Sequence, residues 1–279
     1  MKKLFLFSAI IALTNCLHAQ DAGLPPRAMT QAELDRWAWV CNGFNKAMPK
    51  TFLDYTMKKE DCNSFDWAET SKGKPLTVTN KKNEPIGNHP NFTMWFTMNE
   101  DSVKAKEDEA SMQILEAKND DGTFDQKKLN LISAKSSKLI ECKTLRVHVT
   151  ANMFMPMQKQ YEKLTKPVKL NLPNNMFAYL YLFPEGKEVA EEGSSIGTDG
   201  QAFYKDKAVI IIGKQPKVTA VTPCNCTWRE EKISFQDSIS DVTTASLKNI
   251  VVEIDGFEKD VRQFITMIDW TTLQAMLNK

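Results

Sequence analysis

The stretch LRVHVTANMFMPM at residues 145–157 decides the expected fold. Every odd-numbered position in it is apolar, and most of the even-numbered positions between are polar. Because the side chains of a strand point alternately to opposite faces, this pattern predicts one β-strand with one buried face. The register predicts that Val147, Val149 and Met153 are buried and that Arg146 and Thr150 are not.

Around this stretch, strand-like and helix-like segments come in blocks. Further strands are predicted at 76–78, 92–98, 177–183, 202–213, 217–222, 232–235 and 249–254, and helices at 31–48, 102–118, 124–139 and 257–277. Because helices and strands are grouped and do not strictly alternate along the chain, the pattern favours an α+β fold. We expect a largely antiparallel sheet packed with an N-terminal helix, a central helical hairpin and C-terminal helices.

The helix boundaries are marked by capping residues. Thr30 and Glu33 form a capping box at the first helix. That helix carries an apolar stripe at steps of three and four, made of Leu34, Trp37, Cys41, Phe44 and Met48. Thr123 and Gln126 are placed to form a second capping box, and Asp269 is placed to cap a separate final helix.

The first 19 residues have the organisation of a secretory signal peptide. Lys2 and Lys3 precede ten residues, Leu4 to Leu13, that are apolar apart from one serine, and a small residue ends the segment. Such a stretch is too short to span a bilayer, which needs about 20 residues. We expect residues 20–279 to form a single α+β domain, with an internal joint near 166–175 as the alternative. The pattern is typical of a Gram-negative periplasmic or secreted protein.

A lipid anchor at Cys16 is the alternative to cleavage. A lipobox places Gly, Ala or Ser before the cysteine, and here that residue is Asn15, so lipidation is not expected. No later apolar run is long enough for a transmembrane segment.

The charge balance speaks against nucleic acid as a partner. Without Lys2 and Lys3 the chain has 34 basic and 35 acidic residues, a net charge of −1. A nucleic-acid-binding domain normally carries a basic patch. The densest basic stretch, at 159–169, contains Lys159, Lys163, Lys166 and Lys169. We interpret it as the solvated face of a short helix.

No catalytic signature is present. The HExxH, GxSxG, Walker A and GxGxxG patterns are all absent. His89 and His148 are the only histidines after residue 19. His148 falls on the polar face of its strand, where a structural role is expected, and no cofactor is predicted.

Five cysteines follow the signal segment: Cys41, Cys62, Cys142, Cys224 and Cys226. Outside the cytoplasm such thiols usually form disulfides, although sequence alone leaves 15 pairings open. A bond between Cys41 and Cys62 would close a loop of about 20 residues. If it forms, Cys142 becomes the expected partner of Cys224 or Cys226, because those two stand only about 6.6 Å apart in an extended chain, near the limit for a disulfide.

Cys224 and Cys226 also allow another hypothesis. Two thiolates on one face of a strand, with Cys142 as a third sulfur, are suitable ligands for Cu(I) or Zn²⁺. The sequence therefore leaves three functions open. An exported non-catalytic protein that binds a protein or small molecule is expected first, a periplasmic enzyme second and soft-metal handling third.

Different structural features would distinguish these functions. An enzyme predicts convergent ionisable groups with shifted pKa values in a pocket, whereas a binding module predicts exposed apolar side chains. Metal handling predicts Cys224 and Cys226 close to a third soft ligand.

Overall fold

The computed structural model describes residues 27–64, 76–77, 90–153, 157–162, 167–173, 176–182, 206–221, 228–235 and 247–277. The helices of this part of the chain are α2 (Gln31–Ala47), α3 (Glu100–Glu116), α4 (Gln126–Cys142), α5 (Glu258–Met267) and α6 (Trp270–Leu277). Its strands are β1 (Arg27–Ala28), β2 (Tyr55–Ser64), β3 (Leu76–Thr77), β4 (Pro90–Met98), β5 (Thr144–Ala151), β6 (Met157–Glu162), β7 (Val168–Lys169), β8 (Phe177–Tyr181), β9 (Asp206–Gly213), β10 (Lys217–Val221), β11 (Trp228–Ser234) and β12 (Asn249–Gly256). The predicted α+β class is confirmed.

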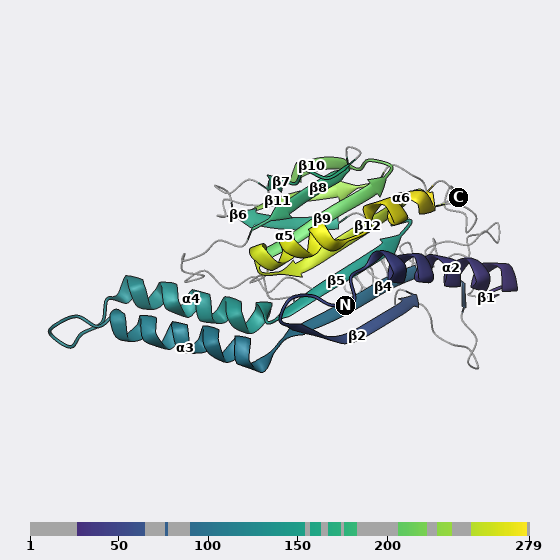
Figure 1. Ribbon diagram of the computed structural model, residues 1–279. Coiled ribbons are helices and arrows are strands. Elements are labelled where there is room, and N and C mark those ends of the chain that lie inside the picture. The colour runs from purple at the N-terminus through teal and green to yellow at the C-terminus, as the bar shows by residue number, and fades with distance from the viewer. Residues whose placement is uncertain are drawn as a thin grey trace, which may run out of the picture.

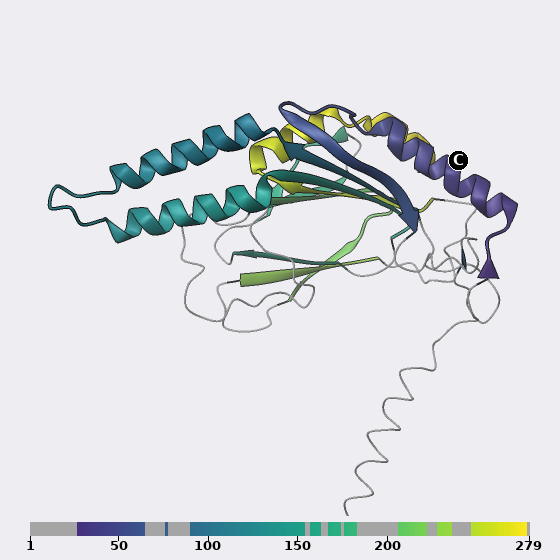
Figure 2. The same ribbon diagram turned by 90° about the horizontal axis from the view of Figure 1, so that it is seen from below.

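A seven-stranded antiparallel sheet forms the centre of the molecule. Its order is β2-β4-β5-β12-β9-β8-β7, and a separate three-stranded sheet has the order β10-β11-β6. Helices α2, α5 and α6 lie along one face of the large sheet, and the small sheet lies on the other side (Figures 1 and 2). The large sheet is therefore the middle layer of three.

The main core lies between the large sheet and the three helices. Phe52, Phe96 and Phe264 are fully buried there, and their rings meet with centroids 5.2 to 6.4 Å apart. Edge-to-face contacts of this kind stabilise a core beyond the burial of apolar area. Helix α2 contributes Val40, Phe44 and Ala47, while Leu34 and Trp37 of the predicted stripe are only partly buried.

Two of the three predicted helix caps are confirmed. Thr30 and Glu33 form the capping box of α2, and Asp269 accepts the backbone N–H of Thr272 in α6. The box expected at Thr123 is wrong, because α4 begins at Gln126 and the Asp125 carboxylate accepts the N–H groups of its first turn. An aspartate immediately before a helix satisfies those orphan donors directly.

The single strand predicted at 145–157 is in fact shorter. β5 ends at Ala151, and Asn152 has a φ of 50°. The Asn152 side chain accepts the backbone N–H of Lys248, 2.6 Å away. A left-handed residue bends the chain and ends the ladder, and asparagine tolerates that conformation better than most residues. Met157 then begins β6, which belongs to the small sheet.

The burial predicted for this stretch is partly right. Val147 and Val149 are fully buried, as expected. Arg146 is only partly buried, in line with the prediction that it is not buried. Thr150 was also expected not to be buried but is only 4% exposed, and Met153 was expected to be buried but is only partly so. The reason for Thr150 is that the second face of the large sheet is also covered, so alternation does not distinguish a buried face from a solvated one here.

Two other segments differ from the prediction. The lysine-rich stretch at 159–169 contains strands β6 and β7 and not the expected helix. β7 lies within residues 166–175, the segment considered as a domain joint. It pairs with β8 at the edge of the large sheet. Strand β2 was not predicted, because its sequence YTMKKEDCNS is mostly polar, as suits an edge strand.

Helices α3 and α4, which we call the arm (residues 100–142), connect two adjacent strands. β4 and β5 pair directly, and the N–H of Met98 donates to the carbonyl of Lys143 at the base of the arm. The arm extends away from the sheet in both views (Figures 1 and 2). It therefore replaces what could have been a short hairpin turn.

Candidate functional site

The strongest cluster of ionisable side chains lies on the face of the large sheet opposite the helices. Cross-strand pairing places His148 of β5 between Thr93 of β4 and Glu253 of β12. The next row brings Arg146 beside Asp255, which in turn faces Lys207 of β9. Directly opposed residues of an antiparallel pair have Cβ atoms about 5 Å apart, so these groups interact.

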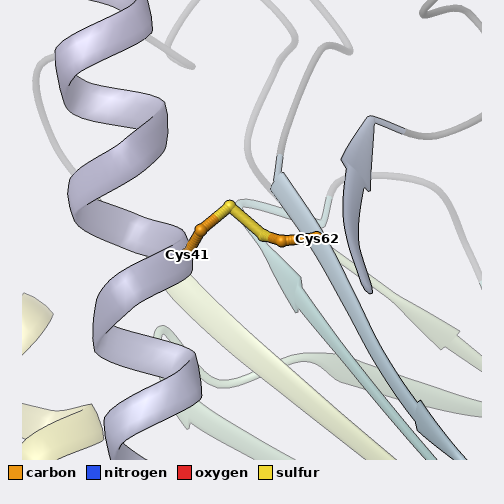
Figure 3. The surroundings of a disulfide bond; sticks show 2 residues. All are labelled: Cys41 and Cys62. Atoms are coloured by element: carbon orange, nitrogen blue, oxygen red, sulfur yellow. A yellow bond between two sulfur atoms is a disulfide. The ribbon is translucent and has the colours of Figure 1, made fainter. Parts of the chain in front are cut away.

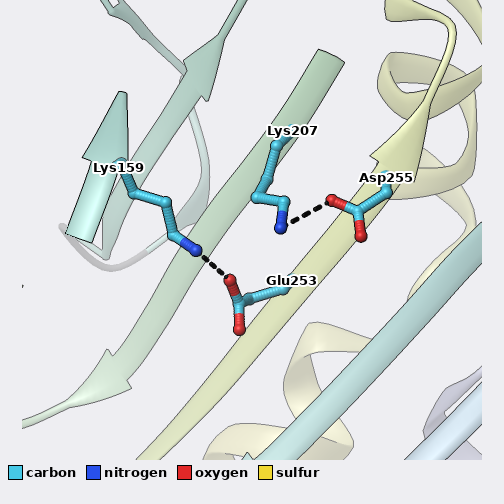
Figure 4. Close-up of polar contacts among 4 residues, drawn as sticks. All are labelled: Lys159, Lys207, Glu253 and Asp255. Carbon is cyan, nitrogen blue, oxygen red and sulfur yellow. Dashed lines mark hydrogen bonds and ion pairs between the residues drawn. The ribbon is translucent and has the colours of Figure 1, made fainter. Parts of the chain in front are cut away.

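Two ion pairs join these charges (Figure 4). Lys159 of β6 contacts Glu253 at 2.5 Å, and Lys207 contacts Asp255 at 3.1 Å. The Lys159 and Glu253 side chains are only 13% and 16% exposed, so water screens the pair little. Because Lys159 comes from the small sheet and Glu253 from the large one, this pair connects the two sheets.

The pKa directions follow from burial and from these partners. Burial alone would raise the pKa of Glu253, but Lys159 and Lys207 beside it lower that pKa to about 2. Burial lowers the pKa of His148, and the neighbouring Glu253 offsets this only in part. For Lys207, the nearby carboxylates outweigh burial and raise its pKa. At neutral pH the carboxylate and the lysine are therefore charged and the histidine is neutral.

The Thr93–His148–Glu253 row has the residue types of a nucleophile, a base and an acid. Thr93 Oγ1 lies 3.3 Å from His148 Nδ1, within hydrogen-bonding distance. Acyl transfer also needs N–H donors aimed at the developing oxyanion. β4 and β5 are both interior strands whose ladders run on both sides, so their backbone N–H groups are engaged within the sheet. The arrangement thus favours a structural ion-pair network over a nucleophilic centre.

Only some of the cysteines lie within the described residues. Cys41 of α2 and Cys62 of β2 form a disulfide, with Cα atoms 5.9 Å apart (Figure 3). This bond holds the N-terminal helix to the edge strand of the large sheet. Cys142 is the last residue of α4, but its side chain, like Cys224 and Cys226, lies outside the described residues. Its pairing with either of them stays a prediction that non-reducing peptide mapping can test.

A metal site can be assessed only where side chains are described. In that part of the chain, no group of three or more His, Cys, Asp or Glu side chains could hold a metal ion. The three sulfurs proposed as soft-metal ligands lie outside it, as does His89.

The end of the arm, residues 112–131, exposes large apolar side chains. Leu115 is 71% exposed and Met112 is 62% exposed, the two highest values among the large apolar side chains described. Three others in this segment are also exposed: Ile114, Phe124 and Leu131. Singly exposed apolar residues are ordinary, but five within 20 residues at the end of a projecting element are typical of a contact surface.

Few of the side chains that the structure describes in the arm are buried. Among its described side chains only Ala117 and Ile132 are buried, and α3 has no buried residue. At its base, Lys106 lies over the ring of Phe257 at 5.3 Å and Val103 packs against the main core. The arm is thus attached to the body at one end, and its other end makes no contribution to the core.

No known protein family, curated protein or solved structure matches this chain. None of the described helices is both long enough and apolar enough to cross a membrane.

The sequence placed His148 on the polar face of its strand and offered Cys41 and Cys62 as a disulfide pair, but it did not reveal the ion-pair network or the exposed end of the arm. The network had a visible signal, since Glu253 and Asp255 alternate with apolar residues in an otherwise apolar strand. The arm had no such signal. Its two helices were predicted, yet periodicity could not tell that Met112 and Leu115 would lack a core to pack against.

Proposed function

We propose that this chain is an exported, non-catalytic protein of the Gram-negative bacterial envelope, periplasmic or secreted, which binds a partner protein through the end of its arm. The observation that carries the proposal is the exposure of Leu115 and Met112 far from the core. Their burial against a partner would be favourable by roughly 25 cal/mol per Å² of apolar surface removed from water.

The ionisable cluster supports binding over catalysis. Its two carboxylates are each neutralised by a lysine, and the low pKa of Glu253 excludes it as a general acid near neutral pH. The signal-like segment at 1–19 supports export, and the Cys41–Cys62 disulfide is consistent with an oxidising compartment.

Export is tested by the mass of the protein purified from its native host. A mature chain beginning at Gln20 is the expected result. A chain that keeps residues 1–19 in the cytoplasm would contradict the proposed location, and a lipid on Cys16 would place the protein at a membrane surface.

Docking is tested by photo-crosslinking in the native host. A photoreactive phenylalanine analogue replaces Leu115 in one variant and Val218 in a matched control, because Val218 of β10 is also an exposed apolar residue, at 40%. We expect a discrete crosslinked product from position 115 and none from position 218. No product at position 115, or equal products from both positions, would contradict a docking role for the arm.

A further inference from the structure

The two helices of the arm carry opposite net charges. α3 contains six acidic and two basic residues, a net charge of −4, whereas α4 contains four basic and one acidic residue, a net charge of +3. Each helix therefore has a composition suited to packing beside the other. This complementarity exists within one arm, and it is equally available between the arms of two copies.

The inner side of α3, which faces α4, is already occupied. Ala117 is buried, and Ala110 and Gln113, seven and four positions earlier, are partly buried, so these three define the inner side. Met112 lies about 140° around the helix from Ala117, and Leu115 about 200°, at about 100° per residue. Both therefore lie on the outer side of α3, which no other described element covers.

The outer side of α3 pairs an apolar residue with an acid. Met112 and Glu116 are four residues apart and so share one face, and both are exposed. On α4, Lys127 and Leu131 have the same spacing and are also exposed. Each helix thus exposes an apolar and a charged side chain four residues apart, and the two charges have opposite sign.

An antiparallel alignment brings these pairs together. Met112 lies four residues before the end of α3, or about 6 Å along the axis, and Leu131 lies five residues after the start of α4, or about 7.5 Å. Glu116 and Lys127 lie level with each other in the same way. One register therefore places Met112 against Leu131 and Glu116 against Lys127.

We propose that the partner of the arm is a second copy of this chain, with the outer side of α3 in one copy packed antiparallel along α4 of the next. This inference rests on the proposed docking role of the arm. The contact repeats the up-and-down packing of α3 against α4 within one arm. It is heterologous, so the assembly closes into a ring or continues as a chain of copies.

A charge-swap experiment tests the proposal by sedimentation velocity on the full mature chain. Wild type is expected to self-associate as its concentration rises, and more weakly at high salt. Glu116→Lys and Lys127→Glu are each expected to weaken association about tenfold, because each creates a like-charge pair at the contact. Both positions are exposed, so neither change should affect folding.

The mixture of the two variants is the decisive sample. Each contact between the Glu116→Lys chain and the Lys127→Glu chain again joins opposite charges, so the mixture is expected to recover association within about twofold of wild type. A general loss of folding or of solubility would not recover on mixing. Met112→Asp, which removes the apolar part of the contact, should not be rescued by either variant.

The outcomes separate this proposal from the docking role itself. Wild type that sediments as a monomer at every concentration, or variants that fail to recover when mixed, would overturn self-association. If position 115 then crosslinks in cells to a chain of a different mass, the arm docks on another protein and only the second-copy inference is wrong. If position 115 gives no product either, both proposals fail.

Discussion

Strand β5 of the large sheet and helix α3 of the arm differ in what surrounds them. In β5, Leu145, Val147 and Val149 are fully inaccessible to solvent, whereas α3 has no buried residue along its 17 positions. Isolated helices of this length are marginal in water. The sheet is therefore stabilised by its own chain, whereas α3 leaves apolar side chains uncovered.

The largest loss of stability is expected when a charge is placed in the buried sheet. Val149→Asp buries an unpaired carboxylate in the main core and should destabilise the fold by more than about 4 kcal/mol, enough to prevent cooperative unfolding from being observed. Thermal unfolding followed by circular dichroism measures it. A Val149→Asp chain that melts like wild type would show that the described packing of β5 is wrong.

Loss of the disulfide is expected to destabilise the same region by a smaller amount. Replacing both Cys41 and Cys62 by serine opens a loop of 21 residues and should lower the free energy of unfolding by about 3 kcal/mol. Urea unfolding of oxidised wild type and of the double variant gives this difference. Equal midpoints would show that the bond does not form or does not constrain the unfolded chain.

The ion-pair network predicts loss of stability in acid. The pKa of Glu253 falls from 4.5 to about 2 on folding, so its contribution is complete above pH 4.5 and is lost as the pH falls towards 2. The change corresponds to about 3 kcal/mol. His148 acts in the same direction below pH 6.5, because its folded pKa is also lowered.

A stability profile from pH 7 to pH 2 checks this expectation. Wild type should lose stability below pH 6.5 and more steeply below pH 4.5, whereas Glu253→Gln should be less stable at pH 7 and have a flatter acid limb. If the two chains gave parallel profiles, the pair with Lys159 would not be lowering the pKa of Glu253 in the folded state.

The smallest effect on stability is expected at the end of the arm. Leu115→Asp introduces a charge of the same sign as Val149→Asp, but at a side chain that is 71% exposed. The free energy of unfolding should change by no more than about 0.5 kcal/mol. Urea unfolding of the monomer measures it, and a loss above about 2 kcal/mol would mean that the arm packs against the body.

The sequence was sufficient for those features that depend on local patterns. Alternation identified β5, and capping residues marked the starts of α2 and α6, because these signals come from neighbouring residues. The sequence could not show that Thr150 is covered, since two of the three strands of the small sheet on that side, β10 and β11, come from distant segments. It also could not show that Met112 and Leu115 are exposed, because a helical stripe looks the same whether or not a core lies opposite it.

Hydrogen exchange of the wild-type chain at a concentration where it is monomeric tests the central contrast most directly. Backbone amides of β5, β9 and β12 should exchange only through global unfolding, while those of α3 and the start of α4 should exchange orders of magnitude faster through local opening. Arm amides protected as strongly as those of β5 in the monomer would show that the arm is part of the core and not a docking element.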